Sequence, residues 1–188
     1  MHRHFLLHKP HGFLSQFIYQ KKRSKRLLGE LFDFPEQTMA IGRLDEDSEG
    51  LLLLTTDGMM SEIIRSKTIE KEYYAQVDGI ITEEAVSQLK SGVEIGFKGI
   101  RYTTKPCQAR IIDELPSCIG QGRRIRDERH GPTSWVSLTL TEGKFRQVRK
   151  MTAAVGFPTL RLIRVRVGSL ELQNLKAGEV KEVDNFLI

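Results

Sequence analysis

The chain has 188 residues, a net charge of +5, and hydrophobic residues at 39% of its positions. This length suits one globular domain or two small halves that share a core, and the apolar content excludes a disordered tail. Two cysteines, Cys107 and Cys118, are too few for a disulfide scaffold and have no metal-site spacing. The longest apolar run, Leu51 to Leu54, excludes a membrane span, and no signal peptide is recognisable, so we expect a cytoplasmic protein.

Charge is distributed unevenly along the chain. Residues 1–29 and 143–170 contain no acidic residue and together carry a net charge of +14, whereas the remaining 131 residues carry −9. If the two blocks meet in space, they predict binding to a polyanion. If they do not, each is an ordinary solvated face.

The first third of the chain predicts short strands, a basic loop and two helices. Strands are expected over residues 4–8, 13–19, 39–41 and 51–55, the last fully buried because four leucines run without a polar residue. A basic loop is expected over 21–26. Leucines at helical spacing predict a short helix over 27–33, and Asp57 is placed to cap a second helix ending near Arg65. Its inward-facing residues would be Met60, Ile63 and Ile64.

The rest of the chain predicts further strands and two helices. Thr82 would cap a helix that ends at Gly92, and a second helix is expected over 145–155, ended by Gly156. A loop is expected over 115–133. Strands are expected over 72–77, 93–97, 107–112, 135–141, 160–167 and 180–183; the strand at 135–141 alternates apolar and polar residues and should be half-buried.

The order of these elements indicates the fold class. Strands and helices lack regular βαβ alternation, which favours an α+β fold with a mixed, mainly antiparallel sheet and flanking helices. No linker or repeat divides the sequence. We therefore expect one domain over residues 1–188.

A polar loop between two apolar strands is the first candidate site. Gly42-Arg43-Leu44-Asp45-Glu46-Asp47-Ser48-Glu49-Gly50 has two glycines and four carboxylates, and loops on a rigid sheet are where functional side chains concentrate. The alternative is a solvated hairpin loop. Calcium binding is disfavoured, because the EF-hand-like spacing of Asp45, Asp47 and Glu49 has Thr56 where a bidentate Glu is needed.

Two further segments carry candidate groups. In Glu142-Gly143-Lys144-Phe145-Arg146-Gln147-Val148-Arg149-Lys150-Met151, helical spacing would place Arg146, Arg149 and Lys150 on one face, suited to phosphate or carboxylate. A basic surface helix is the alternative. In Lys71-Glu72-Tyr73-Tyr74, alternation sends one tyrosine to the core and leaves the other able to stack on a base.

These motifs together resemble the RsuA/RluB/RluE/RluF family of ribosomal RNA pseudouridine synthases. The segments that carry the resemblance are Gly42 to Asp45, Ser48-x-Gly50 to Gly58, Lys9-Pro10-x-Gly12, Lys71-x-Tyr73, Glu142 to Met151, and Gly156-Phe157-Pro158 to Arg164 with Gly168 and Gly178. They occur in the family's order over nearly the whole chain. Pro132-Thr133-Ser134-Trp135 favours the RluE branch.

The resemblance implies a pseudouridine synthase fold and a cofactor-free isomerisation of a uridine in ribosomal RNA, of the large subunit by branch. Asp45 would be the nucleophile, Arg149 its basic partner, and Tyr73 the active-site tyrosine that stacks on the target base. Residues expected to bind substrate or RNA are Lys9, Arg43, Leu44, Lys71, Arg146, Lys150, Arg161 and Arg164.

The resemblance also implies partners and domain content. The partner would be ribosomal RNA with the uridine flipped out of its stack, and no metal, organic cofactor or membrane is implied. We expect a monomer without the S4-type RNA-binding domain that most relatives carry, because Phe5 already falls in the first catalytic strand.

Two other functions remain open from the sequence. One is a catalytically inactive ribosomal RNA-binding or ribosome-assembly factor of the same fold. The other is a nucleotide glycosidase, which would need a paired general acid, and Asp47 is the only nearby candidate.

Overall fold

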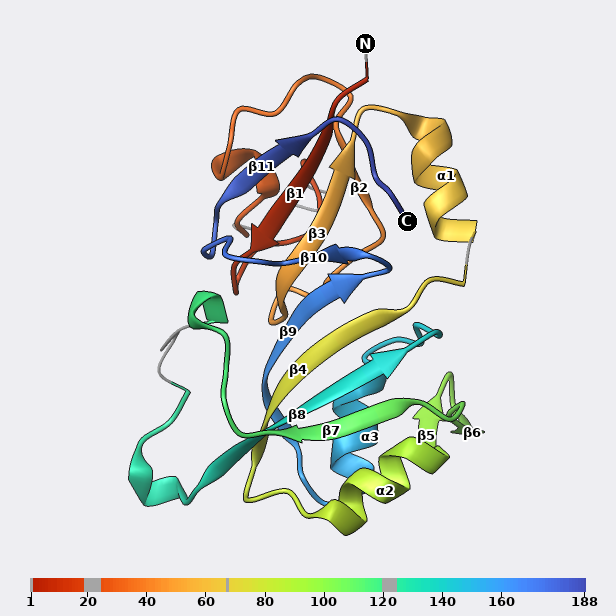
Figure 1. Cartoon of the computed structure of the whole chain (residues 1–188), viewed down its shortest axis with the longest axis vertical. Helices are drawn as coiled ribbons and strands as arrows, with labels where there is room; N and C mark the ends of the chain where they lie inside the picture. Colours follow the sequence, from red (N-terminus) through yellow and green to blue (C-terminus); the bar gives the residue numbers. More distant parts are fainter. Residues whose placement is uncertain (1, 19–24, 67, 120–124) are drawn as a thin grey trace. The chain divides into compact units, whose positions relative to one another are not determined.

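The computed structural model describes residues 2–18, 25–66, 68–119 and 125–188. The chain packs as two units, one formed by residues 1–69 with 163–188 and the other by residues 70–162 (Figure 1). No helix of the described residues is long and apolar enough to cross a membrane. The interpretation of residues 1–188 as one catalytic domain stays a prediction.

The first unit is built around strand β3. Its elements are β1 (His4–Lys9), the 3-10 turn η1 (Leu28–Glu30), β2 (Met39–Ile41), β3 (Glu49–Thr55), α1 (Gly58–Ser66), the end of β9 (Thr159–Val167), β10 (Leu170–Glu171) and β11 (Val180–Val183). Strand β3 pairs antiparallel with β1 along its length. On its other side it pairs antiparallel with β2 and, through Glu49 and Gly50, parallel with β9. Its four leucines are therefore buried, as predicted.

The second unit has two helices packed on one face of a sheet in which β4, β8 and β7 are neighbours. Its elements are β4 (Lys71–Asp78), α2 (Glu83–Ser91), β5 (Glu94–Phe97), β6 (Ile100–Thr103), β7 (Gln108–Ile112), η2 (Ser117–Ile119), η3 (Glu128–His130), β8 (Thr133–Leu140), α3 (Gln147–Ala154) and the start of β9. The sheet order is β4-β8-β7, all antiparallel. The core joins alternate residues of β4 and β8 to the apolar sides of both helices: Ala75, Val77, Val136, Leu138, Leu140, Ala85, Val86, Leu89, Val148 and Met151.

Sequence signals at several element ends are confirmed. The Asp57 Oδ1 atom accepts hydrogen bonds from the backbone N–H groups of Met59 and Met60, at 2.9 and 3.1 Å. Thr82 Oγ1 accepts from the N–H of Ala85 at 3.2 Å, and Gly92 follows α2 with a φ of 97°. The α+β class with a mainly antiparallel sheet is confirmed. Among the described residues, β1–β11, β1–β3, β2–β3, β9–β10, β4–β8 and β7–β8 pair antiparallel, whereas β3–β9 pairs parallel.

Other predictions were wrong. Residues 13–18 form no strand, only a single bridge between Phe13 and Arg26, because their backbone groups bond to loops; Tyr19 and residues 21–24 lie outside the described residues. The helix expected over 27–33 is reduced to η1, since Leu27 is extended and its N–H is capped by Glu30. Ile63 is exposed, unlike Ile64.

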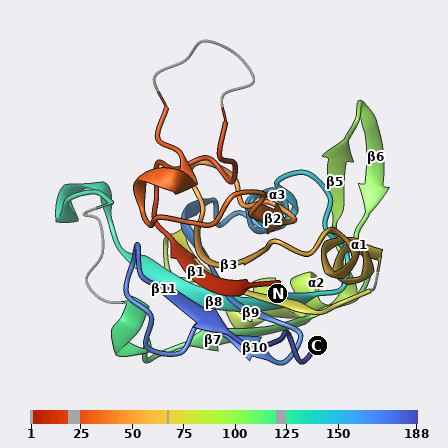
Figure 2. The same ribbon diagram turned by 90° about the horizontal axis from the view of Figure 1, so that it is seen from above.

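The predictions for the second unit also need corrections. Strand β8 is covered on both faces, because the polar-face Ser137 donates to Glu72 and is buried. Helix α3 begins two residues late, since Arg146 has a left-handed φ of 52°. Strand β6 was not predicted; it pairs with β5 through a turn in which Lys98 and Gly99 both have positive φ, the geometry of a type I′ hairpin. The resulting ribbon stands beside α3 (Figure 2).

The two glycines that flank the candidate loop 42–50 differ in their surroundings, which gives a stability prediction. A Cβ atom on Gly50 would lie 2.2 Å from the backbone oxygen of Arg164, whereas one on Gly42 would meet nothing within 4 Å. Both have positive φ. We expect Gly50→Ala to lower the free energy of unfolding by more than about 3 kcal/mol and Gly42→Ala by about 1 kcal/mol, measured by urea denaturation. Equal losses would contradict the close β3–β9 approach.

Candidate active site

The loop that carries Asp45 is held through its backbone. It lies between β2 and β3 in the first unit, and Ser15 binds the residue before Asp45 twice. Ser15 Oγ donates to the carbonyl of Leu44 at 2.8 Å, and the N–H of Leu44 donates to Ser15 Oγ at 3.0 Å. After Asp45, the N–H of Ser48 donates to the Asp45 carbonyl at 3.0 Å. These bonds fix the position of the backbone on both sides of Asp45.

Segment 9–15 supports the same loop. The N–H of Gly12 donates to the carbonyl of Glu46 at 2.8 Å. Lys9 is fully buried, and its Nζ atom donates to the carbonyls of Pro10, Phe13 and Glu46 at 3.1, 2.7 and 3.5 Å. The Lys9 ammonium therefore joins β1 to the loop that carries Asp45. The sequence predicted that Lys9 binds RNA and gave no sign of this internal role.

The environment of Lys9 shifts its titration. Burial lowers the pKa of the Lys9 ammonium to about 8, although the carboxylates of Glu49, Asp47, Asp45 and Glu46 act in the opposite direction. Asp45 is thus one of the charges that attract this buried cation. The cost of desolvation exceeds that attraction.

This shift predicts a pH dependence of stability. Between pH 8 and 10.5 the unfolded chain keeps the Lys9 proton and the folded chain does not, so raising the pH favours the folded state. Relative to Lys9→Met, the wild-type free energy of unfolding should rise across this window by on the order of 2 kcal/mol. Urea denaturation of both proteins at several pH values tests it, and a difference that stays flat or falls would refute the shift.

The two predicted RNA-binding arginines of the first unit have different settings. Arg43 is exposed, and its Nη2 atom lies 3.4 Å from Gln16 Oε1. Arg164 is buried in β9, where its Nε atom donates to the Leu51 carbonyl at 2.8 Å. Arg164 therefore helps to hold β3, and Leu44 is likewise buried. Of the three, Arg43 is the one with an exposed side chain.

In the second unit, the two tyrosines of β4 point to opposite faces. Tyr73 shares a face with Ala75 and packs at the border of the apolar core. Tyr74 lies on the other face under Arg110, whose Nη2 atom is 3.4 Å from the Tyr74 hydroxyl. The prediction that one tyrosine is core-facing is confirmed, and this is the tyrosine that the family resemblance places in the active site.

The basic residues around α3 do not form the single helical face that spacing predicted. Arg146 precedes the helix in a left-handed conformation, so it departs from the i, i+3, i+4 geometry. Arg149 lies on the helix with Nη1 3.5 Å from the Thr159 carbonyl. Lys150 Nζ donates to the Gly96 carbonyl of β5 at 2.8 Å. Lys71 begins β4, opposite Leu140.

Glu142 organises the start of α3, a role that sequence reasoning missed. Its carboxylate accepts hydrogen bonds from the Tyr102 hydroxyl at 2.5 Å, from the Lys105 N–H at 2.9 Å and from Gln147 Nε2 at 2.6 Å. Burial raises the pKa of Glu142, but these bonds outweigh it and hold that pKa below its usual range. The sequence did contain a signal for this role, because Glu142 begins the segment Glu142 to Met151 that carries the family resemblance.

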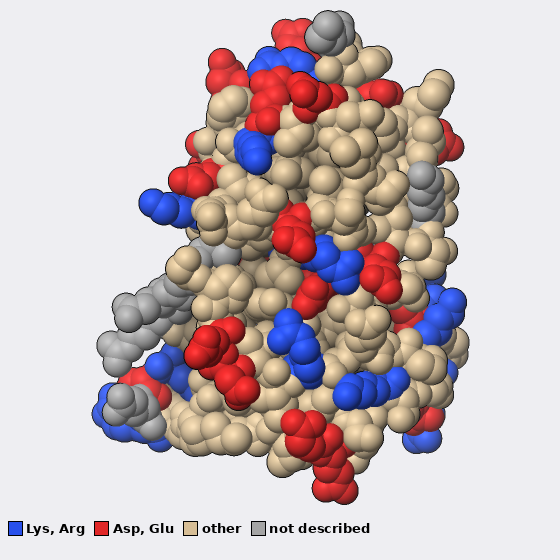
Figure 3. Space-filling view, in the orientation of Figure 1, with Lys and Arg blue, Asp and Glu red and all other residues tan. Residues whose placement is uncertain are grey.

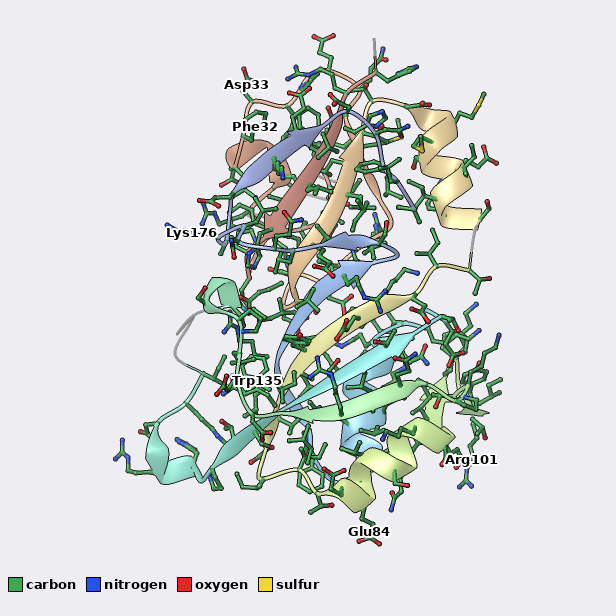
Figure 4. The ribbon with its side chains drawn as sticks, in the orientation of Figure 1. Phe32, Asp33, Glu84, Arg101, Trp135 and Lys176 are labelled. Atoms are coloured by element: carbon green, nitrogen blue, oxygen red, sulfur yellow. The ribbon has the colours of Figure 1, made fainter. Side chains whose placement is uncertain are left out.

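Arg161 is buried at the start of β9. Its Nη2 atom is 3.3 Å from the Ile119 carbonyl, and its guanidinium lies 5.9 Å from the ring of Trp135, which Figure 4 labels on β8. Arg161 thus contacts loop 115–133 at Ile119; residues 120–124 of this loop lie outside the described part. The described residues of this loop include the 3-10 turns η2 and η3.

The structure also bears on the calcium and polyanion interpretations. The segments that flank the loop carrying Asp45 are strands, whereas an EF-hand needs helices. Among the described residues, no group of three or more His, Cys, Asp or Glu side chains is placed to hold a metal. On the face drawn in Figure 3, basic and acidic side chains are interspersed. This face therefore has no continuous positively charged surface.

Comparison with known proteins gives the family. The family described as RNA pseudouridylate synthase matches residues 3–154. "Ribosomal large subunit pseudouridine synthase E" of Xanthomonas axonopodis pv. citri (strain 306) is 42% identical over 172 residues, which cover 90% of this chain and 88% of that protein. The protein of the same name from Vibrio vulnificus (strain CMCP6) is 40% identical over 95% of this chain and 74% of its own length.

A solved structure agrees with the sequence comparisons. The protein described as "Crystal structure of pseudouridylate synthase" superposes with a TM-score of 0.76 at 28% identity, over 97% of this chain and 70% of that one. Together with the match over residues 3–154, this similarity confirms the fold that the sequence motifs implied. The chain therefore belongs to the RNA pseudouridylate synthase family.

Proposed function

We propose that this protein isomerises a uridine of large-subunit ribosomal RNA to pseudouridine with Asp45 as the nucleophile. The observation that carries the proposal is the anchoring of the backbone on both sides of Asp45, by Ser15 and by Ser48, which gives this residue a defined place in the loop between β2 and β3. The names of the relatives from Xanthomonas and Vibrio support the large ribosomal subunit as the source of the substrate.

The proposed chemistry needs a carboxylate that is ionised at neutral pH. Asp45 adds to an electron-poor carbon of the nucleotide, and the C1′–N1 bond breaks. The uracil rotates, C5 bonds to C1′, the proton on C5 is released, N1 gains a proton, and the carboxylate leaves. Atoms and electrons balance without a cofactor, because the product is an isomer of the substrate.

Other side chains have supporting roles in the proposal. Arg149 pairs with Asp45 and keeps it ionised and oriented, since a guanidinium holds a carboxylate without delivering a proton. Tyr73 stacks on the flipped uracil beside the C5 proton. Arg43, Lys71, Arg146, Lys150 and Arg161 bind phosphates or bases around it. We assign Lys9, Leu44 and Arg164 to support of the Asp45 loop and β3, because all three are buried.

Nothing in the comparisons favours a catalytically inactive factor, and the following experiment separates the two functions. Large-subunit ribosomal RNA transcribed with [5-³H]uridine should release tritium with the wild-type protein. Pseudouridine mapping of ribosomal RNA from cells with and without the protein should then show one site that depends on it. RNA binding without tritium release from large- or small-subunit RNA would support the inactive factor instead. We further propose that the protein acts as a monomer in the cytoplasm, which light scattering and fractionation test.

A further inference from the structure

Aromatic rings and lysines gather where the β5–β6 ribbon meets the start of α3. Lys144 Nζ lies 5.1 Å from the ring centroid of Phe97 and 5.0 Å from that of Tyr102, and Lys98 Nζ lies 5.5 Å from Phe97. Lys150 Nζ lies 5.5 Å from the ring of Phe145. We call these six residues the aromatic–basic platform: Phe97, Lys98, Tyr102, Lys144, Phe145 and Lys150.

Phe145 is the unexplained member of this platform. Its side chain is 66% exposed, although the helix pattern of residues 145–155 places it beside core positions. Because α3 begins only at Gln147, Phe145 lies in the preceding loop and takes no part in the core. One exposed ring is not unusual by itself, but a ring that lies beside lysines offers the combination of aromatic face and positive charge that unpaired nucleotides bind.

The platform is held in place before any ligand binds. Tyr102 donates to Glu142 at 2.5 Å, and Lys150 donates to the Gly96 carbonyl at 2.8 Å, so the ribbon is tied to both ends of the segment that carries Phe145. The type I′ turn at Lys98 and Gly99 fixes the end of the ribbon. A ligand would therefore meet a preformed surface.

The charges of the platform favour an anionic ligand. Within the part of the chain that the structure describes, no carboxylate lies within 4.0 Å of Lys98, Lys144 or Lys150. The Glu142 carboxylate accepts from Tyr102, Lys105 and Gln147, and Glu94 pairs with Arg101, which points outward from β6 in Figure 4. An apolar protein partner would bury three uncompensated ammonium groups, at a large desolvation cost.

We propose that the aromatic–basic platform binds a single-stranded stretch of the RNA that carries the target uridine, with one unpaired base stacked on Phe145 and the neighbouring phosphates held by Lys98 and Lys144. Aromatic faces alternating with cations are the sequence-tolerant surface for unpaired nucleotides. A base paired within a duplex offers no free face, so the platform selects a single-stranded stretch of the RNA. This inference rests on the proposed function and specifies the form of its substrate.

The test compares Phe145→Ala, Phe145→Leu and Phe145→Trp on a large-subunit ribosomal RNA fragment that the wild-type protein modifies. Alanine and leucine should each raise Kd and KM about tenfold, because both remove the aromatic face, whereas tryptophan should restore wild-type values. Ile80→Ala, which removes a 60% exposed side chain of the same unit outside the platform, is the control and should change neither. Thermal melting monitored by circular dichroism checks folding.

A second set of variants tests the lysines. Lys98→Gln and Lys144→Gln should each reduce the slope of log Kd against log salt concentration by about 0.7.

A further experiment tests the preference for single strands. Annealing a complementary strand to the unpaired nucleotides next to the target uridine should remove the difference in Kd between Phe145→Ala and wild type. Equal Kd values for wild type and Phe145→Ala on an RNA that the wild type modifies would overturn the platform. Failure of the wild type to modify any ribosomal RNA, with binding still dependent on Phe145, would overturn the proposed function alone.

Discussion

Asp45→Asn is expected to abolish isomerisation, with a loss of at least about 10⁴-fold in kcat, while RNA binding stays within a few-fold of wild type. An amide of the same size carries no negative charge and is a poor nucleophile. The fold should survive, because Ser15 and Ser48 hold the loop through bonds to the backbone of Leu44 and Asp45, which the substitution keeps. Tritium release from [5-³H]uridine RNA measures turnover, and filter binding measures affinity.

Asp47→Asn is the matched control for this variant. It makes the same chemical change two residues along the same loop, and Asp47 is the residue that a glycosidase mechanism would use as general acid. We expect its kcat to stay within about threefold of wild type, as for a substitution outside the reacting groups. Turnover retained by Asp45→Asn would remove Asp45 from its proposed role, and a large loss with Asp47→Asn would favour the glycosidase interpretation.

Arg149→Ala and Lys150→Ala should differ in kind as well as in size. Removing the proposed partner of Asp45 should lower kcat by about 10²- to 10³-fold, the usual effect of losing one charged group that stabilises the reacting centre. Lys150 instead contacts Gly96 and the ring of Phe145, so its loss should appear mainly in KM. Single-turnover kinetics at saturating RNA separate the two effects.

Arg149→Lys tests whether charge alone is sufficient. Lysine keeps the positive charge but loses the planar pair of donors, so we expect it to recover only part of the lost rate. Equal kcat losses for Arg149→Ala and Lys150→Ala would mean that both residues serve as diffuse phosphate contacts. Full recovery with lysine would argue against a bidentate pair with Asp45.

Features set by neighbouring residues were predictable from the sequence. Asp57 and Thr82 cap helices because an oxygen on a short side chain reaches backbone N–H groups two or three residues away. The run from Leu51 to Leu54 forms a buried strand because an unbroken apolar segment has no face to give to water. The motif around Asp45 likewise identified the loop, and the comparisons confirmed the family.

Features set by distant residues were not predictable. Nothing near Lys9 in the sequence shows that its ammonium reaches the Glu46 carbonyl, 37 residues away, or that burial lowers its pKa to about 8. Arg164 likewise contributes to the basic block by composition but bonds to Leu51, 113 residues away. A charge count cannot distinguish a buried cation from an exposed one.

The sequence by itself therefore determined the fold class, most of the strands and the identity of the loop that carries Asp45, because short-range hydrogen bonds and apolar periodicity act within a few residues. The tertiary structure alone decided which cations are buried against backbone carbonyls, as Lys9 and Arg164 are, and which are exposed, as Arg43 is. It also decided that α3 begins late enough to leave Phe145 exposed beside the β5–β6 ribbon. The burial of a cation depends on backbone carbonyls and carboxylates that come from remote positions in the sequence. Only the folded chain brings these groups together.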